Sequence, residues 1–231
     1  MTNSPSKIIL AAIFGFALAF TFSCSGGTSS PSDGGGTNKC TDIANCQTKQ
    51  IGSQNWMAEN LNIDVSGSKC YGNNPANCTK YGRLYDWSTA MALPASCNSS
   101  SCVSQINAKH RGICPGGWHI PSDAEWTTLT DYVGGASTAG TKLKSIEGWN
   151  FHSGVPSGTD EFGFSALPGG YGKSGSFGYV GISGDWWSAS EYGSEYSSYD
   201  VYSRRIDYDD EYVHYDISHK YNMFSVRCLQ D

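Results

Sequence analysis

The chain has 231 residues, of which 39% are hydrophobic and 13% aromatic, and its formal net charge is −6 at pH 7. An acidic chain without a basic patch excludes the electrostatic footprint that nucleic-acid binding needs, so we expect no nucleic-acid partner. The length allows one large domain together with processing segments.

The first segment carries an export signal. After Lys7, residues 8–22 form an unbroken apolar or small run, which is shorter than the roughly 20 residues of a membrane-spanning helix and suits a signal peptide. A cysteine follows at once, so we expect a lipoprotein signal at 1–23 and lipidation of Cys24, with ordinary secretion or an uncleaved anchor as alternatives. Residues 24–39 are rich in Gly and Ser and are expected to form a flexible tether. The expected location is the outer membrane or cell surface, with the lipid on Cys24 as the membrane contact.

The cysteines indicate an exported, disulfide-stapled domain. Nine cysteines less Cys24 leave eight, an even number typical of disulfide frameworks. Proximity suggests three pairs and leaves a fourth, although eight cysteines allow 105 connectivities: Cys40 with Cys46, Cys70 with Cys78, Cys97 with Cys102, and Cys114 with Cys228. The alternative, a metal site, lacks the usual Cys and His spacing, so we expect no metal and no cofactor.

The elements of the domain at 40–231 begin with extended chain. Residues 48–61 predict two strands around a turn at Gly52-Ser53, with Trp56 in the core. Residues 62–80 are polar and Asn- and Gly-rich, which predicts a surface loop. A short helix is expected after residues 81–87 and should end before Pro94.

The central segment predicts a helix with a defined start. Ser122 and Glu125 have the spacing of a capping box. Trp126, Leu129 and Val133 then recur on one helical face, and Gly134-Gly135 ends the run. A second, shorter helix is expected from about Ser137 to Ile146.

The rest of the chain reads as a long loop followed by strands. Residues 148–184 are rich in glycine and aromatic residues without a lasting period, and a loop of this length in a compact domain is usually functional. Three strands then form an expected antiparallel meander, at 185–190, 199–208 and 212–218. A last strand, Phe224 to Leu229, should be covered on one face.

Six blocks of sequence together resemble the Fibrobacter succinogenes major paralogous domain over about residues 48 to 230. The longest reads Cys-Pro-Gly-Gly-Trp-His-Ile-Pro-Ser-Asp-Ala-Glu-Trp. The blocks lie, in order, at 51–61, 81–87, 114–126, 163–170, 185–190 and 224–228.

That family is similar in turn to the C-type-lectin-like fold, which formylglycine-generating enzymes share. The resemblance implies an α+β, C-type-lectin-like fold with two main helices, an antiparallel sheet and a long Gly- and aromatic-rich binding region. It also implies an exported surface protein, and a Cys114 to Cys228 link is common in that fold. The family implies no established activity, and a fold alone does not supply one.

Aromatic residues point to a binding module for a glycan or a surface protein. Ten of the fourteen tyrosines lie between Tyr171 and Tyr221, and tyrosine offers a flat apolar face with a hydroxyl at low entropic cost. Trp186 and Trp187 are neighbours on a strand, so at most one of them can belong to the site. The candidate ligand-binding residues are Trp149, Tyr171, Phe177, Tyr179, Trp187 and Tyr199.

Three alternatives remain. Catalysis of the formylglycine-generating kind needs reactive cysteines and a metal, and every cysteine here has a plausible partner, so we expect no enzyme and no catalytic residue. Calcium-assisted sugar binding is a second alternative, but the chain lacks the sugar-selecting triplets of the lectins that bind in this way. The acidic run with Asp207 and residues 209–211 is interpreted as a solvated turn. A structural or variable surface antigen without a small ligand shares every feature of the binding module.

Overall fold

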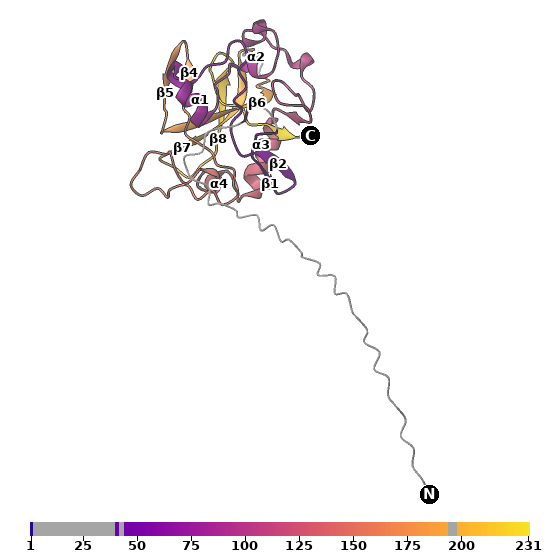
Figure 1. Cartoon of the computed structure of the whole chain (residues 1–231). Helices are drawn as coiled ribbons and strands as arrows, with labels where there is room; N and C mark the ends of the chain where they lie inside the picture. Colours follow the sequence, from indigo (N-terminus) through magenta and orange to yellow (C-terminus); the bar gives the residue numbers. More distant parts are fainter. Residues whose placement is uncertain (2–39, 42–43, 194–197) are drawn as a thin grey trace. The chain divides into compact units, whose positions relative to one another are not determined.

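The computed structural model describes Met1 and residues 40–41, 44–193 and 198–231. The predicted signal peptide, the tether and Cys24 lie outside these residues. Chain contacts separate Met1–Ser32 from Asp33–Asp231, and the fold below is that of the second unit (Figure 1). No helix in the described ranges is long and apolar enough to cross a bilayer.

A four-stranded antiparallel sheet joins the start, middle and end of this unit. The strands β1 and β2 form the predicted hairpin, turning at Gly52, whose φ is +60°. The last strand then inserts between β2 and β3. In sheet order the strands are β1 (Thr48–Ile51), β2 (Gln54–Met57), β9 (Leu229–Gln230) and β3 (Trp118–His119).

Within the described residues, four α-helices and three short 3-10 turns connect the strands. The α-helices are α1 (Pro75–Tyr81), α2 (Trp87–Ala90), α3 (Asp123–Tyr132) and α4 (Ala136–Leu143). The 3-10 turns lie at Tyr71–Asn73, Ala95–Asn98 and Val103–Gln105.

Helix α1 corrects the prediction of a plain loop at 62–80. Asn74 accepts a hydrogen bond from the amide of Ala76, and Pro75 occupies the first turn, which are both ordinary helix-start signals. The polar composition of the segment hid them. Helix α4 ends earlier than predicted because Lys144 leaves the helix to bridge with Ala166.

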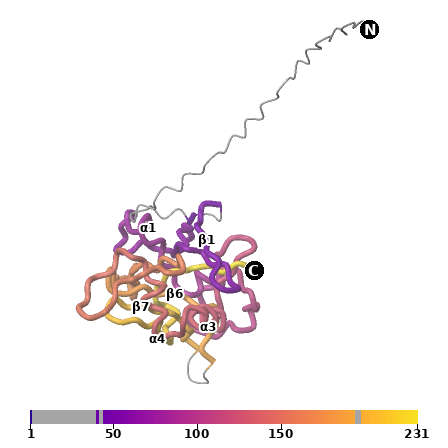
Figure 2. The backbone as a smooth tube through the Cα atoms, turned by 90° about the horizontal axis from the view of Figure 1, so that it is seen from below, coloured from indigo at the N-terminus to yellow at the C-terminus, as the bar shows by residue number. Residues whose placement is uncertain are grey.

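Helix α3 has the predicted capping box. The amide of Glu125 donates to Ser122 Oγ at 3.3 Å, and the amide of Ser122 donates to Glu125 Oε2 at 2.8 Å. Trp126, Leu129 and Val133 are all buried, so the predicted apolar face is confirmed. Helix α3 lies against the strands β6 and β7 (Figure 2).

The predicted meander is a three-stranded antiparallel sheet in the order β6-β7-β8. A small hairpin, β4-β5, interrupts the segment predicted as a long loop. It lies beside the segment that leads into α1 (Figure 1), where Tyr71 packs on Phe177 with ring centroids 5.5 Å apart. The bounds are β4 (Tyr171–Lys173), β5 (Ser176–Gly178), β6 (Ser183–Glu191), β7 (Asp200–Asp207) and β8 (His214–His219). Mixed helices and antiparallel sheets make the fold α+β.

The C-terminal segment differs from the single-faced strand that was predicted. Phe224 and Ser225 make isolated bridges to Tyr85 and Trp186, and regular pairing begins at Leu229. Ser225 and Arg227 are as buried as the apolar residues that alternate with them. Both faces are therefore covered.

Two hydrophobic clusters form the core, and they divide the neighbouring tryptophans. Trp187 packs in the first cluster, with its ring centroid 4.3 Å from that of Phe224. Trp186 packs in the second, where Trp126 lies 6.5 Å away. Successive strand residues point to opposite faces, so β6 supplies both clusters.

All four predicted disulfides are present: Cys40–Cys46, Cys70–Cys78, Cys97–Cys102 and Cys114–Cys228. The last joins residues 114 apart in sequence. In the chain-entropy model such a loop closure stabilises a fold by about 4 to 5 kcal/mol, and the shortest loop here by about 2 kcal/mol.

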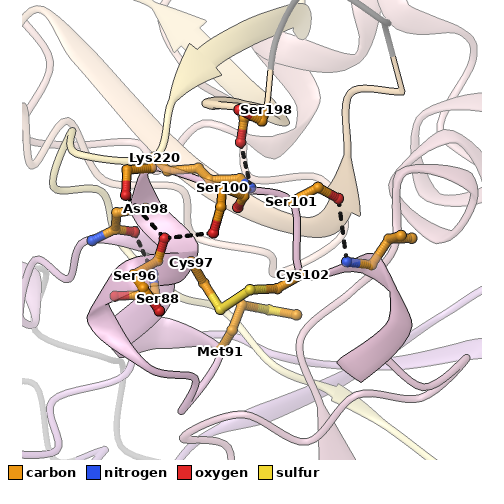
Figure 3. The surroundings of a disulfide bond; sticks show 12 residues. Ser88, Met91, Ser96, Cys97, Asn98, Ser100, Ser101, Cys102, Ser198 and Lys220 are labelled. Carbon is orange, nitrogen blue, oxygen red and sulfur yellow. Dashed lines mark hydrogen bonds between the residues drawn. A yellow bond between two sulfur atoms is a disulfide. The ribbon is translucent and has the colours of Figure 1, made fainter.

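The Cys97–Cys102 loop is held by a buried cation. Lys220 is fully buried, and its Nζ donates to the carbonyl of Ser100 at 3.0 Å (Figure 3) and to Glu191 Oε1 at 2.9 Å. A buried charge needs such pairing. Lys220 therefore ties the disulfide-closed loop to the end of β6.

Candidate functional site

One half of a face of the β6-β7-β8 sheet is polar. Directly paired residues share a face, and the register pairs Ser183 with Asp207, Asp185 with Arg205, and Arg205 with His214. Ser203, Asp216 and Ser218 continue the same face. The opposite face packs on α3 through Trp186 and Arg204. We call the polar residues on the face away from α3 the polar sheet face. They are Ser183, Asp185, Ser203, Arg205, Asp207, His214, Asp216 and Ser218.

A hollow of about 260 Å³ opens over this face at its β7–β8 end. Two tyrosines from the β4-β5 hairpin and the turn after it form one wall, and the polar sheet face and the turn after β7 form the rest. The lining residues are Tyr171, Tyr179, Ile182, Ser183, Arg205, Asp207, Tyr208 and Asp209.

The tyrosine wall is a stacked pair. The rings of Tyr171 and Tyr179 lie with centroids 5.1 Å apart and an interplanar angle of 14°. Tyr171 is anchored edge-on against buried Phe224 at 5.8 Å, whereas Tyr179 is 53% exposed. The pair therefore presents a supported aromatic face to solvent.

A second hollow, of about 370 Å³, lies on the hairpin side of the same two tyrosines. Phe177 and Lys173 help to line it. Three of the predicted ligand-binding residues thus meet in one place: Tyr171, Phe177 and Tyr179.

The other three predicted residues lie elsewhere. Trp149 is partly buried, donates its indole N–H to the carbonyl of Ala166 at 3.0 Å, and lines a separate small hollow. Trp187 is 0% exposed, so its burial removes it from the candidate surface. Tyr199 is exposed but precedes β7, at the opposite end of that strand from Asp207.

Arg205 sits at the centre of the polar sheet face with its charge already matched. Its Nε lies 2.9 Å from Asp207 Oδ2, and its Nη1 lies 3.5 Å from Asp216 Oδ2. Burial alone would lower the pKa of Arg205, but the charges of Asp207 and Asp216 outweigh it and raise that pKa. The guanidinium is therefore a permanent, oriented donor group.

Asp185 lies beneath this arrangement. It is 5% exposed, and Ser183 Oγ donates to it at 2.7 Å. Burial raises the pKa of Asp185 to about 7, in spite of that hydrogen bond and of the nearby Arg205 charge. The polar sheet face thus holds a buried carboxyl group, next to Arg205, whose pKa lies near neutrality.

The turn after β7 is more ordered than the predicted solvated turn. Asp210 accepts hydrogen bonds from the amide of Tyr212 at 2.9 Å and from His214 Nε2 at 2.7 Å. Ligand atoms of Asp207, Asp210 and His214 lie within 4.8 Å of one another. Imidazole and carboxylates are a donor set that a divalent cation accepts, although here they neutralise one another and Arg205 in ion pairs.

His119 forms a different polar group, at the start of α3. It is 1% exposed and is bonded on both ring nitrogens, to Asp231 at 2.7 Å and to Glu125 at 3.0 Å. The hydroxyl of Ser122 donates to the Glu125 carboxylate. Both carboxylates orient His119, and these two hydrogen bonds connect Asp231 at the C-terminus to Glu125 in α3.

The polar sheet face was missed from the sequence, although a signal exists. In β7 the run Ser203-Arg204-Arg205-Ile206-Asp207 alternates a polar set with a mixed one, and β8 repeats the pattern with His214 and Asp216. Alternation indicates two faces. It does not indicate which polar side chains of separate strands meet.

A family model described as the Fibrobacter succinogenes major domain matches residues 50–230. No curated protein and no solved structure is similar enough to this chain to be a match.

Proposed function

The chain belongs to the Fibrobacter succinogenes major domain family, and on that premise we propose that it is a cell-surface binding module that recognises a glycan. The observation that carries the proposal is the exposed aromatic face of Tyr179, supported by Tyr171, beside a row of polar side chains. Such a hollow is concave, partly apolar and equipped with a few convergent polar groups, as ligand sites usually are.

The chemistry of the hollow suits a sugar ring. A sugar has an apolar C–H face that can lie on an aromatic ring, and hydroxyl groups around its edge. Ionised groups such as Arg205 and Asp207 form strong hydrogen bonds with hydroxyls. Both kinds of contact are within one hollow of about 260 Å³, which leaves room for one or two sugar units.

A binding role is supported over a catalytic one by the cysteines. In the described part of the chain all eight cysteines are in disulfides. No thiol in that part is free for chemistry of the formylglycine-generating kind.

We also propose the finer features that the family resemblance implies. The fold is proposed to be C-type-lectin-like, with support from the α+β architecture and from the disulfide between Cys114 and the segment before the last strand. The chain is proposed to be lipid-anchored through Cys24 at the outer membrane or cell surface, with support from the apolar run that precedes Cys24.

The test is a glycan-array and plant-polysaccharide pull-down with the full chain, oxidised and purified in detergent. Tyr179→Ala should abolish most of the binding, because it removes the exposed aromatic face. Tyr221→Ala is the matched control, since Tyr221 is 59% exposed but lies beyond the far end of β8. Equal loss in both variants would contradict the assigned site.

The same pull-down in EDTA separates two modes of sugar binding. Binding that survives EDTA is expected if the tyrosine wall and the polar side chains suffice. Loss in EDTA, together with loss in His214→Ala, would instead establish a cation held by Asp207, Asp210 and His214. No binding in either condition would favour the second candidate, a structural surface antigen.

A further inference from the structure

The polar sheet face and the turn that follows it carry an excess of negative charge. Five carboxylates gather there, while three basic side chains, Arg205, Lys144 and His214, oppose them. The carboxylates are those of Asp207, Asp209, Asp210, Glu211 and Asp216. Asp185 is left out of this balance because burial raises its pKa to about 7.

None of the three is available to an anionic ligand, since His214 is already paired with Asp207 and Asp210. Arg205, the cation among the residues that line the hollow, is already paired with Asp207 and Asp216. Lys144 is 1% exposed, and its Nζ donates to the carbonyl of Asp210 at 2.6 Å behind the turn. Lys173 is exposed but lines the other hollow, across the tyrosine wall.

A ligand in the hollow therefore meets carboxylates that keep free acceptor capacity. Asp209 is exposed, lies in the turn after β7 and lines the hollow, so its carboxylate can reach a bound group. An anionic ligand would have to break the ion pairs of Arg205 and would leave Asp207 and Asp216 uncompensated. Uncompensated like charges are costly in a partly desolvated site.

We propose that the hollow selects glycans by charge: it favours amino-substituted sugars over neutral ones and rejects polysaccharides that carry carboxylates or sulfates. This inference rests on the proposed glycan-binding function. One unit charge about 6 Å away in a water-like dielectric changes affinity about threefold. We expect affinity to fall about three- to tenfold from amino-substituted to neutral glycans, and again from neutral to anionic glycans.

The experiment compares three pentasaccharides of equal length with the full chain: a β-1,4 glucose pentamer, a glucosamine pentamer and a galacturonate pentamer. Titration at about pH 5.5 keeps exposed carboxylates ionised, and the amines protonated. Measurements at low and at high salt identify the electrostatic part, since screening removes it.

Two variants test the source of the preference. Asp209→Asn removes an exposed charge that lines the hollow and should lower the ratio of glucosamine-pentamer affinity to glucose-pentamer affinity about threefold. Asp131→Asn is the matched control, since it removes an exposed charge on α3, outside the hollow. A thermal melt verifies that each variant is folded.

The outcomes separate this inference from the proposed function. The inference is supported if affinity falls from the glucosamine pentamer to the glucose pentamer to the galacturonate pentamer. This preference should also be weaker at high salt and in Asp209→Asn. Binding of the galacturonate pentamer as tightly as the glucose pentamer, or a preference that Asp209→Asn leaves intact, overturns it while glycan binding stands. No binding of any pentamer, together with a silent glycan array, overturns both.

Discussion

Arg227 is a buried charged side chain that is matched mainly by neutral groups. Arg227 is 1% exposed, donates to Asn60 Oδ1 at 2.9 Å and to the carbonyl of Phe164, and lies with its guanidinium carbon 4.1 Å from the Phe164 ring centroid. Burial lowers the pKa of Arg227 to about 9. Carbonyls and an aromatic face thus take the place of a directly bonded carboxylate, which a guanidinium tolerates because it is planar and weakly hydrated.

Asp185 is the residue for which pH should change stability. The pKa of Asp185 is raised by burial from 3.8 to about 7 in the folded state. Because the pKa of Asp185 is higher in the folded state, the stability that the protonated carboxyl group contributes is fully present below about pH 4. It is lost as pH rises through about 7. Asp185→Asn should therefore raise the free energy of unfolding above pH 7, by an amount on the order of 1 to 3 kcal/mol, because it keeps a hydrogen-bonding group without the buried charge.

Urea unfolding of the wild type and of Asp185→Asn at pH 5 and pH 8 checks this. The advantage of the variant should grow from pH 5 to pH 8. A variant that is equally less stable at both pH values would show that Asp185 is needed as a carboxylate.

At the scale of elements, the β4-β5 hairpin positions the tyrosine wall, and a glycine permits the close approach of its two strands. Gly170 has a φ of +63° and comes directly before β4. A Cβ there would lie 2.3 Å from the carbonyl oxygen of Gly178 in β5. The close approach of the two strands, and with it the position of Tyr171, depends on this missing side chain.

Gly170→Ala should therefore displace the hairpin and weaken glycan binding by tenfold or more, with a loss of about 2 to 3 kcal/mol in unfolding free energy from strain and backbone conformation. The measurements are a denaturant titration and the binding assay. Gly178→Ala is the control, because its added Cβ meets nothing within 4 Å. Equal behaviour of the two variants would contradict this role of Gly170.

At the scale of the whole molecule, three kinds of contact join the C-terminal segment to earlier parts of the described domain. The strand β9 inserts between β2 and β3, which lie at the start and the middle of the described domain. The disulfide Cys114–Cys228 joins the same segments, just before β3 and β9. His119 adds a polar link to Asp231 at 2.7 Å. Covalent, sheet and polar contacts therefore all hold the C-terminus in one position.

Removing this closure should cost more than removing a local staple. The double variant Cys114→Ala with Cys228→Ala is expected to lose about 4 to 5 kcal/mol of unfolding free energy, and Cys97→Ala with Cys102→Ala about 2 kcal/mol, because the entropy of loop closure grows with loop length. Urea titrations of both variants measure the difference. Equal losses would show that native packing, rather than loop entropy, sets the contribution of each disulfide.

Sequence alone determined the features that local chemistry specifies. The capping box at Ser122 and Glu125, the hairpin around Gly52 and the three short disulfides involve residues a few positions apart, so short-range rules suffice. The family blocks likewise lie along the chain in order, and the family is confirmed over residues 50–230.

Tertiary structure alone decided which side chains are buried in the core and which gather on the polar sheet face beside the hollow. Adjacent Trp186 and Trp187 both became core, since each face of β6 is covered by a different cluster. Asp185, Arg205 and His214 meet because of the register of three strands, and a shift of one residue would have put each on the other face. Register depends on packing between distant segments, and this is the physical reason that the tyrosines were foreseen while their polar partners were not.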